Sequence, residues 1–265
     1  MQTFNRSSNI DFSSWTAAAI KDYLTSADRL RPEEIAALCN DGRKSVQEQI
    51  FAYLRQRANR HRAAELLHKM AAKEEALRKQ GYIFVAGVDE AGRGPLAGPV
   101  VAAAVILGAA GDYRWQGIND SKQLSPVKRD QYYKVIIQQA RAWAVGIVDA
   151  ATVDRLNIYR ASLEAMRLAV TKLHPQPRFV ISDGFTIPDL DLPQEAVPGG
   201  DAVCLSIAAA SIIAKVTRDR LMQAYEKTYP GYGFARHKGY PTPEHKKALQ
   251  ILGPTPIHRR TFKCF

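Results

Sequence analysis

The feature that most constrains this chain is a pair of carboxylates between a short apolar run and a glycine-rich turn. Residues 83–88 are apolar, Asp89 and Glu90 follow them, and residues 91–94 read Ala-Gly-Arg-Gly. Neighbouring side chains of a strand point to opposite faces, so both acids can serve one site only if the strand ends there. The glycines permit that ending. The pattern predicts oxygen ligands for a hard divalent cation, beside a phosphodiester that the turn and Arg93 bind.

A competing interpretation takes Gly92, Gly94 and Gly98 as a dinucleotide-binding fingerprint, in which a strand leads through a glycine turn into a helix. The spacing differs from that fingerprint. The segment that follows contains two prolines and then a β-branched, alanine-rich run at residues 100–107, which predicts a second strand and not a helix. We therefore favour the cation site.

The charge of the chain indicates a polyanionic partner. It has 265 residues, with 37 lysines and arginines against 26 acids and a net charge of +11. Such a surface attracts nucleic acid, while a few clustered acids can hold the metal ions that cleave it. The simpler alternative is a basic protein whose charge serves only solubility.

Three cysteines, Cys39, Cys204 and Cys264, have no metal-ligand spacing, and an odd number without a secretory context argues against a disulfide framework. The polar N-terminus lacks a signal-peptide core, and no uncharged stretch approaches the roughly 18 residues of a membrane helix. We expect a cytoplasmic protein with reduced thiols and no membrane association.

Residues 1–72 predict a small helical accessory module. Residues 15–24, 33–38 and 43–78 have helical spacing or helix-start signals, the last helix continuing beyond the module. The longest of these helices carries a basic stretch consisting of Arg55, Arg57, Arg60 and Arg62. This stretch is compatible with a nucleic-acid contact and equally with a solvated charged face.

Residues 73–265 alternate strands with helices and predict an α/β catalytic domain that ends in a helical section. Beyond the two strands above, strands are expected at residues 142–148, 179–182 and 195–197. Helices are expected to start at residue 125 or 126 and to cover residues 153–173, 202–227 and 243–252.

Two further acids occupy element boundaries. Asp183 follows the strand at residues 179–182, and Asp201 follows two glycines at the expected start of a helix. Alone, an aspartate at a helix start is more often an N-cap. Together with Asp89 and Glu90, however, these acids supply the oxygen ligands that two cations need for phosphodiester cleavage.

These residues belong to motifs that resemble bacterial ribonuclease HII. The matching blocks run in family order and comprise residues 87–98 (GVDEAGRGPLAG), 120–122 (DSK), 182–184 (SDG), 200–201 (GD), 206–219 (SIAAASIIAKVTRD), 232–240 (YGFARHKGY) and 258–260 (HRR). The resemblance implies a ribonuclease H-like fold with a central mixed five-stranded sheet flanked by helices. The related ribonuclease HIII would carry a different turn after its first acids and a glutamate among the last ones.

The resemblance further implies an endonuclease that hydrolyses the RNA strand of RNA/DNA hybrids and cuts 5′ of single ribonucleotides embedded in duplex DNA. Products would carry 5′-phosphate and 3′-hydroxyl ends. Asp89, Glu90, Asp183 and Asp201 match the family's catalytic, metal-binding acids, which hold two Mg²⁺ or Mn²⁺ ions. The alternatives are a catalytically idle hybrid-binding protein and a ribonuclease HIII-like specificity.

The same resemblance assigns substrate recognition to residues near the acids. Gly92, Arg93 and Gly94 match the turn that recognises the ribose 2′-hydroxyl, and Tyr240 matches a tyrosine that senses the RNA-to-DNA junction. Lys122 and Lys215 are candidate phosphate contacts. Ser121, Ser206 and Ser211 are candidates for supporting hydrogen bonds, although Ser211, Lys215 and Asp219 share one helix face and can satisfy one another. The tail at residues 261–265 lacks a sliding-clamp-binding pattern, so we expect no clamp partner. We also expect a monomer with no obligate protein partner.

Overall fold

A computed structural model of the chain describes residues 10–27, 29–108, 115, 117–118 and 120–262. The chain divides into two compact units, Met1–Glu65 and Leu66–Phe265. Cys264 and the last three residues of the tail lie outside the described residues, whereas Cys39 and Cys204 are free thiols. Across the described ranges, no helix combines the length and the apolar character that crossing a membrane requires.

The N-terminal unit is helical, as the sequence predicts. It contains α1 (Ala17–Ser26), α2 (Pro32–Cys39) and the beginning of α3 (Lys44–Lys79), a single helix that continues into the second unit. The Thr16 side chain caps α1, and Pro32 occupies the first turn of α2. The core of this unit consists of Phe12, Ile20, Leu24, Leu30, Leu38, Val46 and Ile50.

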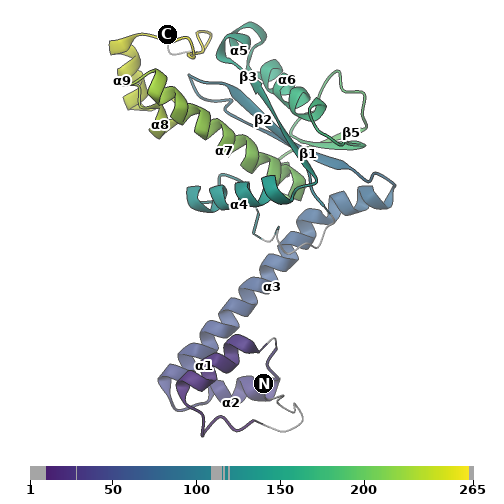
Figure 1. Ribbon diagram of the computed structural model, residues 1–265, viewed down its shortest axis with the longest axis vertical. Coiled ribbons are helices and arrows are strands. Elements are labelled where there is room, and N and C mark those ends of the chain that lie inside the picture. The colour runs from purple at the N-terminus through teal and green to yellow at the C-terminus, as the bar shows by residue number, and fades with distance from the viewer. Residues whose placement is uncertain (1–9, 28, 109–114, 116, 119, 263–265) are drawn as a thin grey trace. The chain divides into compact units, whose positions relative to one another are not determined.

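The second unit is built on a mixed five-stranded sheet, which confirms the predicted fold class (Figure 1). The strands are β1 (Val85–Ala91), β2 (Val100–Ile106), β3 (Ala142–Val148), β4 (Phe179–Asp183) and β5 (Gln194–Val197). Their order is β3-β2-β1-β4-β5. Strand β1 pairs antiparallel with β2 and parallel with β4, so it lies at the centre of the sheet.

Helices cover both faces of this sheet (Figure 1). Helix α6 (Ile158–Thr171) packs on the face formed by Ala86, Val88 and their neighbours, and α7 (Leu205–Thr228) packs on the other. Helix α4 (Pro126–Gln139) lies against α7. Gly87 lets α7 approach β1, because a Cβ atom there would lie 2.2 Å from the Ser206 carbonyl carbon.

Apart from shifts of one or two residues, three elements differ from the predictions. Strand β1 continues through both acids to Ala91, because its pairing with β2 extends to Val101. The single helix expected at residues 153–173 is two helices, α5 (Ala150–Leu156) and α6. They are separated at Asn157, which has φ 68° and caps α6 with its side chain.

The third difference concerns the helix expected at residues 202–227. Helix α7 begins at Leu205, and a separate 3₁₀ turn, η2 (Gly200–Ala202), precedes it. Asp201 therefore lies inside a short turn and is not the N-cap of α7, whose N-cap is Cys204. This turn brings Asp201 to the edge of the sheet, where β4 ends.

The C-terminal section contains α8 (Phe234–His237) and α9 (Pro243–Leu252). The Thr242 side chain caps α9, as the sequence predicts. The hydrophobic core of the C-terminal section contains Ala97, Met222, Tyr232, Phe234 and Leu249. This section therefore packs on the end of α7 and on the turn that follows β1.

Candidate active site

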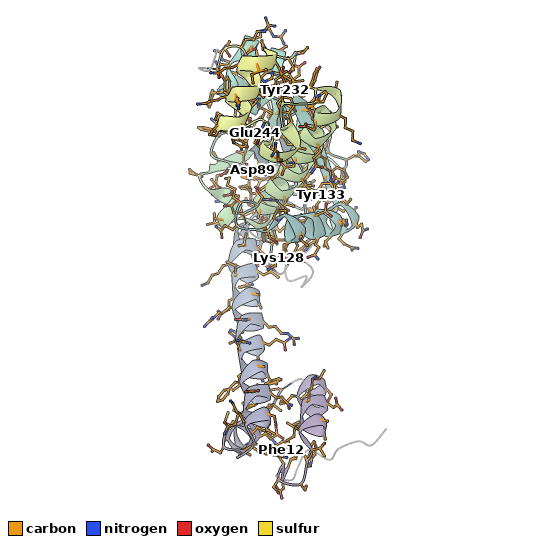
Figure 2. All side chains as sticks on the ribbon, turned by 90° about the vertical axis from the view of Figure 1, so that its left-hand side faces the viewer. Phe12, Asp89, Lys128, Tyr133, Tyr232 and Glu244 are labelled. Atoms are coloured by element: carbon orange, nitrogen blue, oxygen red, sulfur yellow. The ribbon has the colours of Figure 1, made fainter. Side chains whose placement is uncertain are left out.

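Three carboxylates meet at the end of the central strands. Asp89, Asp183 and Asp201 each place an oxygen atom within 4.8 Å of the others. Asp89 and Asp201 are buried, with 5% and 6% of their surface exposed, whereas Asp183 is partly exposed. Asp89 lies in the sheet-containing unit, below the C-terminal section that carries Tyr232 and Glu244 in the view of Figure 2.

The topology explains how residues so far apart in sequence meet. Val88 and Ser182 are partners in the parallel pairing of β1 and β4, so the next residue of each strand, Asp89 and Asp183, emerges at the same sheet edge. Asp183 Oδ1 accepts a hydrogen bond of 2.8 Å from the Gly200 amide. That bond fixes the turn η2 and, with it, Asp201.

The electrostatics of this cluster favour a bound cation. Burial raises the pKa of Asp89 well above its usual range, and the charges of Glu90 and Asp183 raise it further. Burial also raises the pKa of Asp201, followed by the charge of Asp120. Clustered carboxylates that repel one another in a buried site have the hard oxygen donors that Mg²⁺ and Mn²⁺ prefer. The residues present therefore fit a divalent metal ion.

Glu90 is arranged differently from the other three acids. It follows Asp89 in the same strand, where side chains alternate, and it lies outside the group of three aspartates. It pairs with Arg93 at 3.2 Å, and the Arg93 guanidinium also lies 5.4 Å from the centre of the Phe185 ring. Burial raises the pKa of Glu90, while Arg93 opposes that shift. The structure thus gathers three of the four predicted acids into one group and holds the fourth beside it.

Lys122 faces the cluster. Its Nζ atom lies 3.6 Å from Asp201 Oδ2, and its side chain is 79% exposed. Burial lowers the pKa of Lys122, but the carboxylates of Asp201, Asp120 and Asp89 outweigh that effect and raise it. An exposed cation beside an acidic site is suited to contact a phosphate.

The other predicted polar contacts have different surroundings. Ser121 and Ser211 hydroxyl groups share a hydrogen bond of 2.9 Å, and the Ser211 hydroxyl also lowers the pKa of Asp89. Lys215 forms an ion pair of 2.6 Å with Asp219, as the spacing on one helix face allows. Ser206 donates its hydroxyl to Glu74, away from the acids.

The glycine turn and Tyr240 are neighbours. A Cβ atom on Gly94 would lie 3.6 Å from Tyr240 Cε1, and Tyr240 is 42% exposed. Within the described chain, the amides of Gly92, Arg93 and Gly94 have no hydrogen-bond acceptor. Amide donors without an acceptor therefore lie close to an exposed aromatic ring.

Sequence reasoning assigned no role to two buried arginines beneath this turn. Arg218 is 1% exposed and Arg259 is 0% exposed, and both donate to backbone carbonyl groups around residues 92–99. Both lie inside the family-like motifs at residues 206–219 and 258–260, but nothing in the sequence pattern marks them as buried. The one sequence signal for buried donors was the glycine turn, because the carbonyl groups of a turn need hydrogen-bond donors from elsewhere in the chain.

Comparisons with known proteins identify the family. A family model described as Ribonuclease HII matches residues 86–265, and one described as Ribonuclease HII N-terminal domain matches residues 16–78. A relative from Pelotomaculum thermopropionicum, named Ribonuclease HII, is 49% identical over 249 residues, which cover 94% of this chain and 93% of that protein.

Solved structures give the same family. Ribonuclease H2 from Pyrococcus horikoshii OT3 is 30% identical with a TM-score of 0.60, covering 68% of this chain and 94% of that one. Ribonuclease HII from Archaeoglobus fulgidus, solved in complex with PCNA, is 26% identical with a TM-score of 0.59, covering 68% of this chain and 95% of that one. The chain therefore belongs to the ribonuclease HII family, whose members are endonucleases of the ribonuclease H type.

Proposed function

We propose that this protein hydrolyses the RNA strand of RNA/DNA hybrids and cuts 5′ of single ribonucleotides embedded in duplex DNA, leaving 5′-phosphate and 3′-hydroxyl ends. The observation that carries the proposal is the cluster of Asp89, Asp183 and Asp201 together with a glycine turn whose amides have no acceptor within the described chain. The cluster supplies the chemistry, and the turn supplies donors that a ribose 2′-hydroxyl can use.

Two divalent cations, Mg²⁺ or Mn²⁺, are the proposed cofactors. Asp89, Asp183 and Asp201 would hold them, with Glu90 completing the set from its position beside Arg93. When bound, the ions would supply an activated water and stabilise charge on the leaving 3′ oxygen. The carboxylates would orient that site, and the buried positions of Asp89 and Asp201 limit access of bulk water.

Recognition would come from groups that contact the sugar and the phosphates. The amides of Gly92 to Gly94 would bind the 2′-hydroxyl, and the Tyr240 ring would lie against the neighbouring sugar. Lys122 is placed to contact a phosphate and Lys215 is a second candidate, while Ser121 supports the site through Ser211. None of these contacts involves a base edge, which suits an enzyme that reads sugar chemistry and not sequence.

The two parts of the chain have different proposed roles. We propose residues 1–72 as an accessory module that adds duplex affinity and residues 73–265 as the catalytic domain. We also propose a monomer without an obligate protein partner, which light scattering of the purified protein tests. A stable dimer in that measurement would contradict the monomer.

Cleavage of a duplex with one embedded ribonucleotide tests the function directly. The assay compares Mg²⁺, Mn²⁺ and a chelator, with an all-DNA duplex of the same sequence as the control. We expect a single cut 5′ of the ribonucleotide, which requires the metal. Binding without cutting under any divalent ion would indicate an idle hybrid-binding protein instead. Cutting only within long hybrids would indicate a specificity like that of ribonuclease HIII.

A further inference from the structure

The turn at residues 92–99 is held from below by the Arg259 side chain. Arg259 is fully buried, and its guanidinium donates hydrogen bonds of 2.6–3.0 Å to carbonyl oxygens. The acceptors are the carbonyl groups of Gly92, Arg93, Pro95 and Gly98. One planar cation therefore fixes the direction of carbonyl groups along most of the turn.

Arg218 extends this support to the segment before Tyr240. Its Nε and Nη2 atoms donate to the carbonyl groups of Pro99 and Ala97, at 3.0 and 3.1 Å. Its Nη1 atom donates to the Lys238 carbonyl at 3.0 Å, two residues before Tyr240. Arg218 thus joins the turn and the segment that carries the tyrosine.

Burying these two charges is costly. Within the described part of the chain, neither guanidinium forms an ion pair with a carboxylate. Burial lowers the pKa of both groups, and the charge of Arg218 lowers that of Arg259 further. Neutral donors would satisfy carbonyl groups at a smaller desolvation cost. The arrangement is therefore better explained by the geometry and positive charge that it gives to the turn.

The glycine at the start of the turn leaves room for the Arg218 side chain. Gly92 has φ 96°, and a Cβ atom there would lie 2.1 Å from Arg218 Nε. The Gly92 and Arg93 carbonyl groups point to Arg259, so the Arg93 and Gly94 amides, in the same trans peptide planes, point away from it. An inward row of carbonyls and an outward row of amides is the arrangement that a hydroxyl or phosphate ligand requires.

We propose that Arg218 and Arg259 are positioning residues for ribonucleotide recognition. Arg259 keeps the turn amides directed at the 2′-hydroxyl, and Arg218 sets the spacing between that turn and Tyr240. This inference rests on the proposed function. It predicts that the arginines determine how well the enzyme discriminates its substrates, while metal binding by the three aspartates does not depend on them.

Two variants test the proposal, Arg259→Lys and Arg218→Lys. Each keeps the charge, but a single ammonium group cannot reproduce the fork of hydrogen bonds. Met166→Ala is the control, because Met166 is fully buried on α6, on the other face of the sheet, and its loss reduces stability away from the turn. Thermal unfolding identifies a temperature at which all variants are folded.

The first measurement is the ratio of kcat/KM on a single embedded ribonucleotide to kcat/KM on a long RNA/DNA hybrid. We expect this ratio to fall at least about tenfold in both arginine variants, and to stay at the wild-type value in Met166→Ala. Calorimetric binding of Mn²⁺ to the free protein should be unchanged in all three. An unchanged ratio in the arginine variants would show that they only stabilise the fold.

The second measurement needs no substrate. The Leu96 and Gly98 amides donate to the Gly239 and Ile257 carbonyl groups, so both should be protected from hydrogen exchange. We expect Arg259→Lys to lose this protection, and retained protection would overturn the positioning role. A wild-type protein that does not cut at a single ribonucleotide would instead refute the proposed function and, with it, this inference.

Discussion

The carboxylate of Glu74 accepts hydrogen bonds from both the backbone amide and the hydroxyl group of Ser206, at 2.8 and 2.6 Å. Ser206 lies in the first turn of α7, and the N-cap residue of that helix, Cys204, provides no side-chain cap. A residue of α3 therefore caps a helix that begins more than a hundred positions later. A negative charge there also stabilises the positive end of the helix dipole. Because η2 directly precedes α7, this contact supports the position of Asp201.

Glu74→Ala should destabilise the protein by about 1–3 kcal/mol, because it leaves a buried amide and a buried hydroxyl without an acceptor. Glu74→Gln should cost less, since the amide oxygen can still accept. Chemical denaturation measures both. The control is Glu75→Ala, at the next and only partly buried position, for which we expect a change within about 0.5 kcal/mol. Equal losses at residues 74 and 75 would contradict the capping role.

Asp89→Asn should abolish turnover and weaken Mn²⁺ binding, and yet stabilise the metal-free protein at neutral pH. The pKa of Asp89 is raised in the folded state, so the folded protein keeps a proton that the unfolded chain has already released. Stability therefore falls as pH rises from the usual carboxyl range through the raised pKa, and asparagine removes that loss. A gain of about 1 kcal/mol would raise Tm by roughly 2–4 °C.

Thermal unfolding in chelator between pH 4 and pH 8 measures this effect. Asp191→Asn, an exposed position, should leave both Tm and its pH dependence unchanged. A lower Tm for Asp89→Asn at pH 7 would mean that the buried carboxylate stabilises the fold, against the expectation.

His258 should make the C-terminal section sensitive to acid. Burial lowers its pKa to about 4, and the neighbouring His245 contributes. His258 Nδ1 accepts from the Thr255 amide at 2.9 Å, and its Nε2 lies 3.1 Å from His245 Nε2, an arrangement that requires neutral rings. Between pH 6.5 and pH 4 the unfolded chain binds a proton that the folded protein does not, so stability should be lost as pH falls through this window.

His258→Asn keeps an acceptor for the Thr255 amide but does not titrate. We expect a lower Tm at pH 7 and a shallower fall of Tm between pH 6.5 and pH 4. His61→Asn is the control, because the side chain of His61 is 76% exposed. If the His258 variant follows the wild-type slope, another group controls the acid sensitivity.

Tyr240→Ala should lose more rate on a single embedded ribonucleotide than on a long RNA/DNA hybrid, because the ring is proposed to test the junction. The matched variant is Tyr240→Phe, which keeps the ring and removes only the hydroxyl. It should retain most of the discrimination. The measurement is kcat/KM on both substrates, and equal losses on both would mean that the ring has only a structural role.

The basic stretch of α3 should contribute nonspecific affinity for duplexes. Replacing Arg55, Arg57, Arg60 and Arg62 by glutamine leaves the helix intact and removes charge from a largely exposed segment. Each lost phosphate contact should reduce the slope of log K against log salt by about 0.9, while kcat stays nearly unchanged. Duplex binding measured over a range of salt concentrations tests this. The same slope as wild type would identify the stretch as a solvated charged face.

Local patterns in the sequence were enough to predict most secondary-structure elements and the acids of the site. Apolar runs and helix-start signals predicted the five strands and an α/β domain, because periodicity and caps are properties of neighbouring residues. The ribonuclease H-like arrangement of the sheet came from the family resemblance of the motifs. The acids at the strand ends and the glycine turn were visible for the same reason. Asp89 and Asp183 could be expected to meet, since parallel neighbours deliver their ends to one edge.

Only the tertiary structure decided the contacts between distant residues. The pairing with β2 carried β1 through both acids, and Glu90 stayed outside the group of three aspartates, which no local signal specifies. Arg218, Arg259 and Glu74 resemble surface charges in the sequence. They are buried because carbonyl groups of a turn and amides of a helix start need partners there. Such partners are selected by the path of the backbone in space, so a pattern of neighbouring residues does not reveal them.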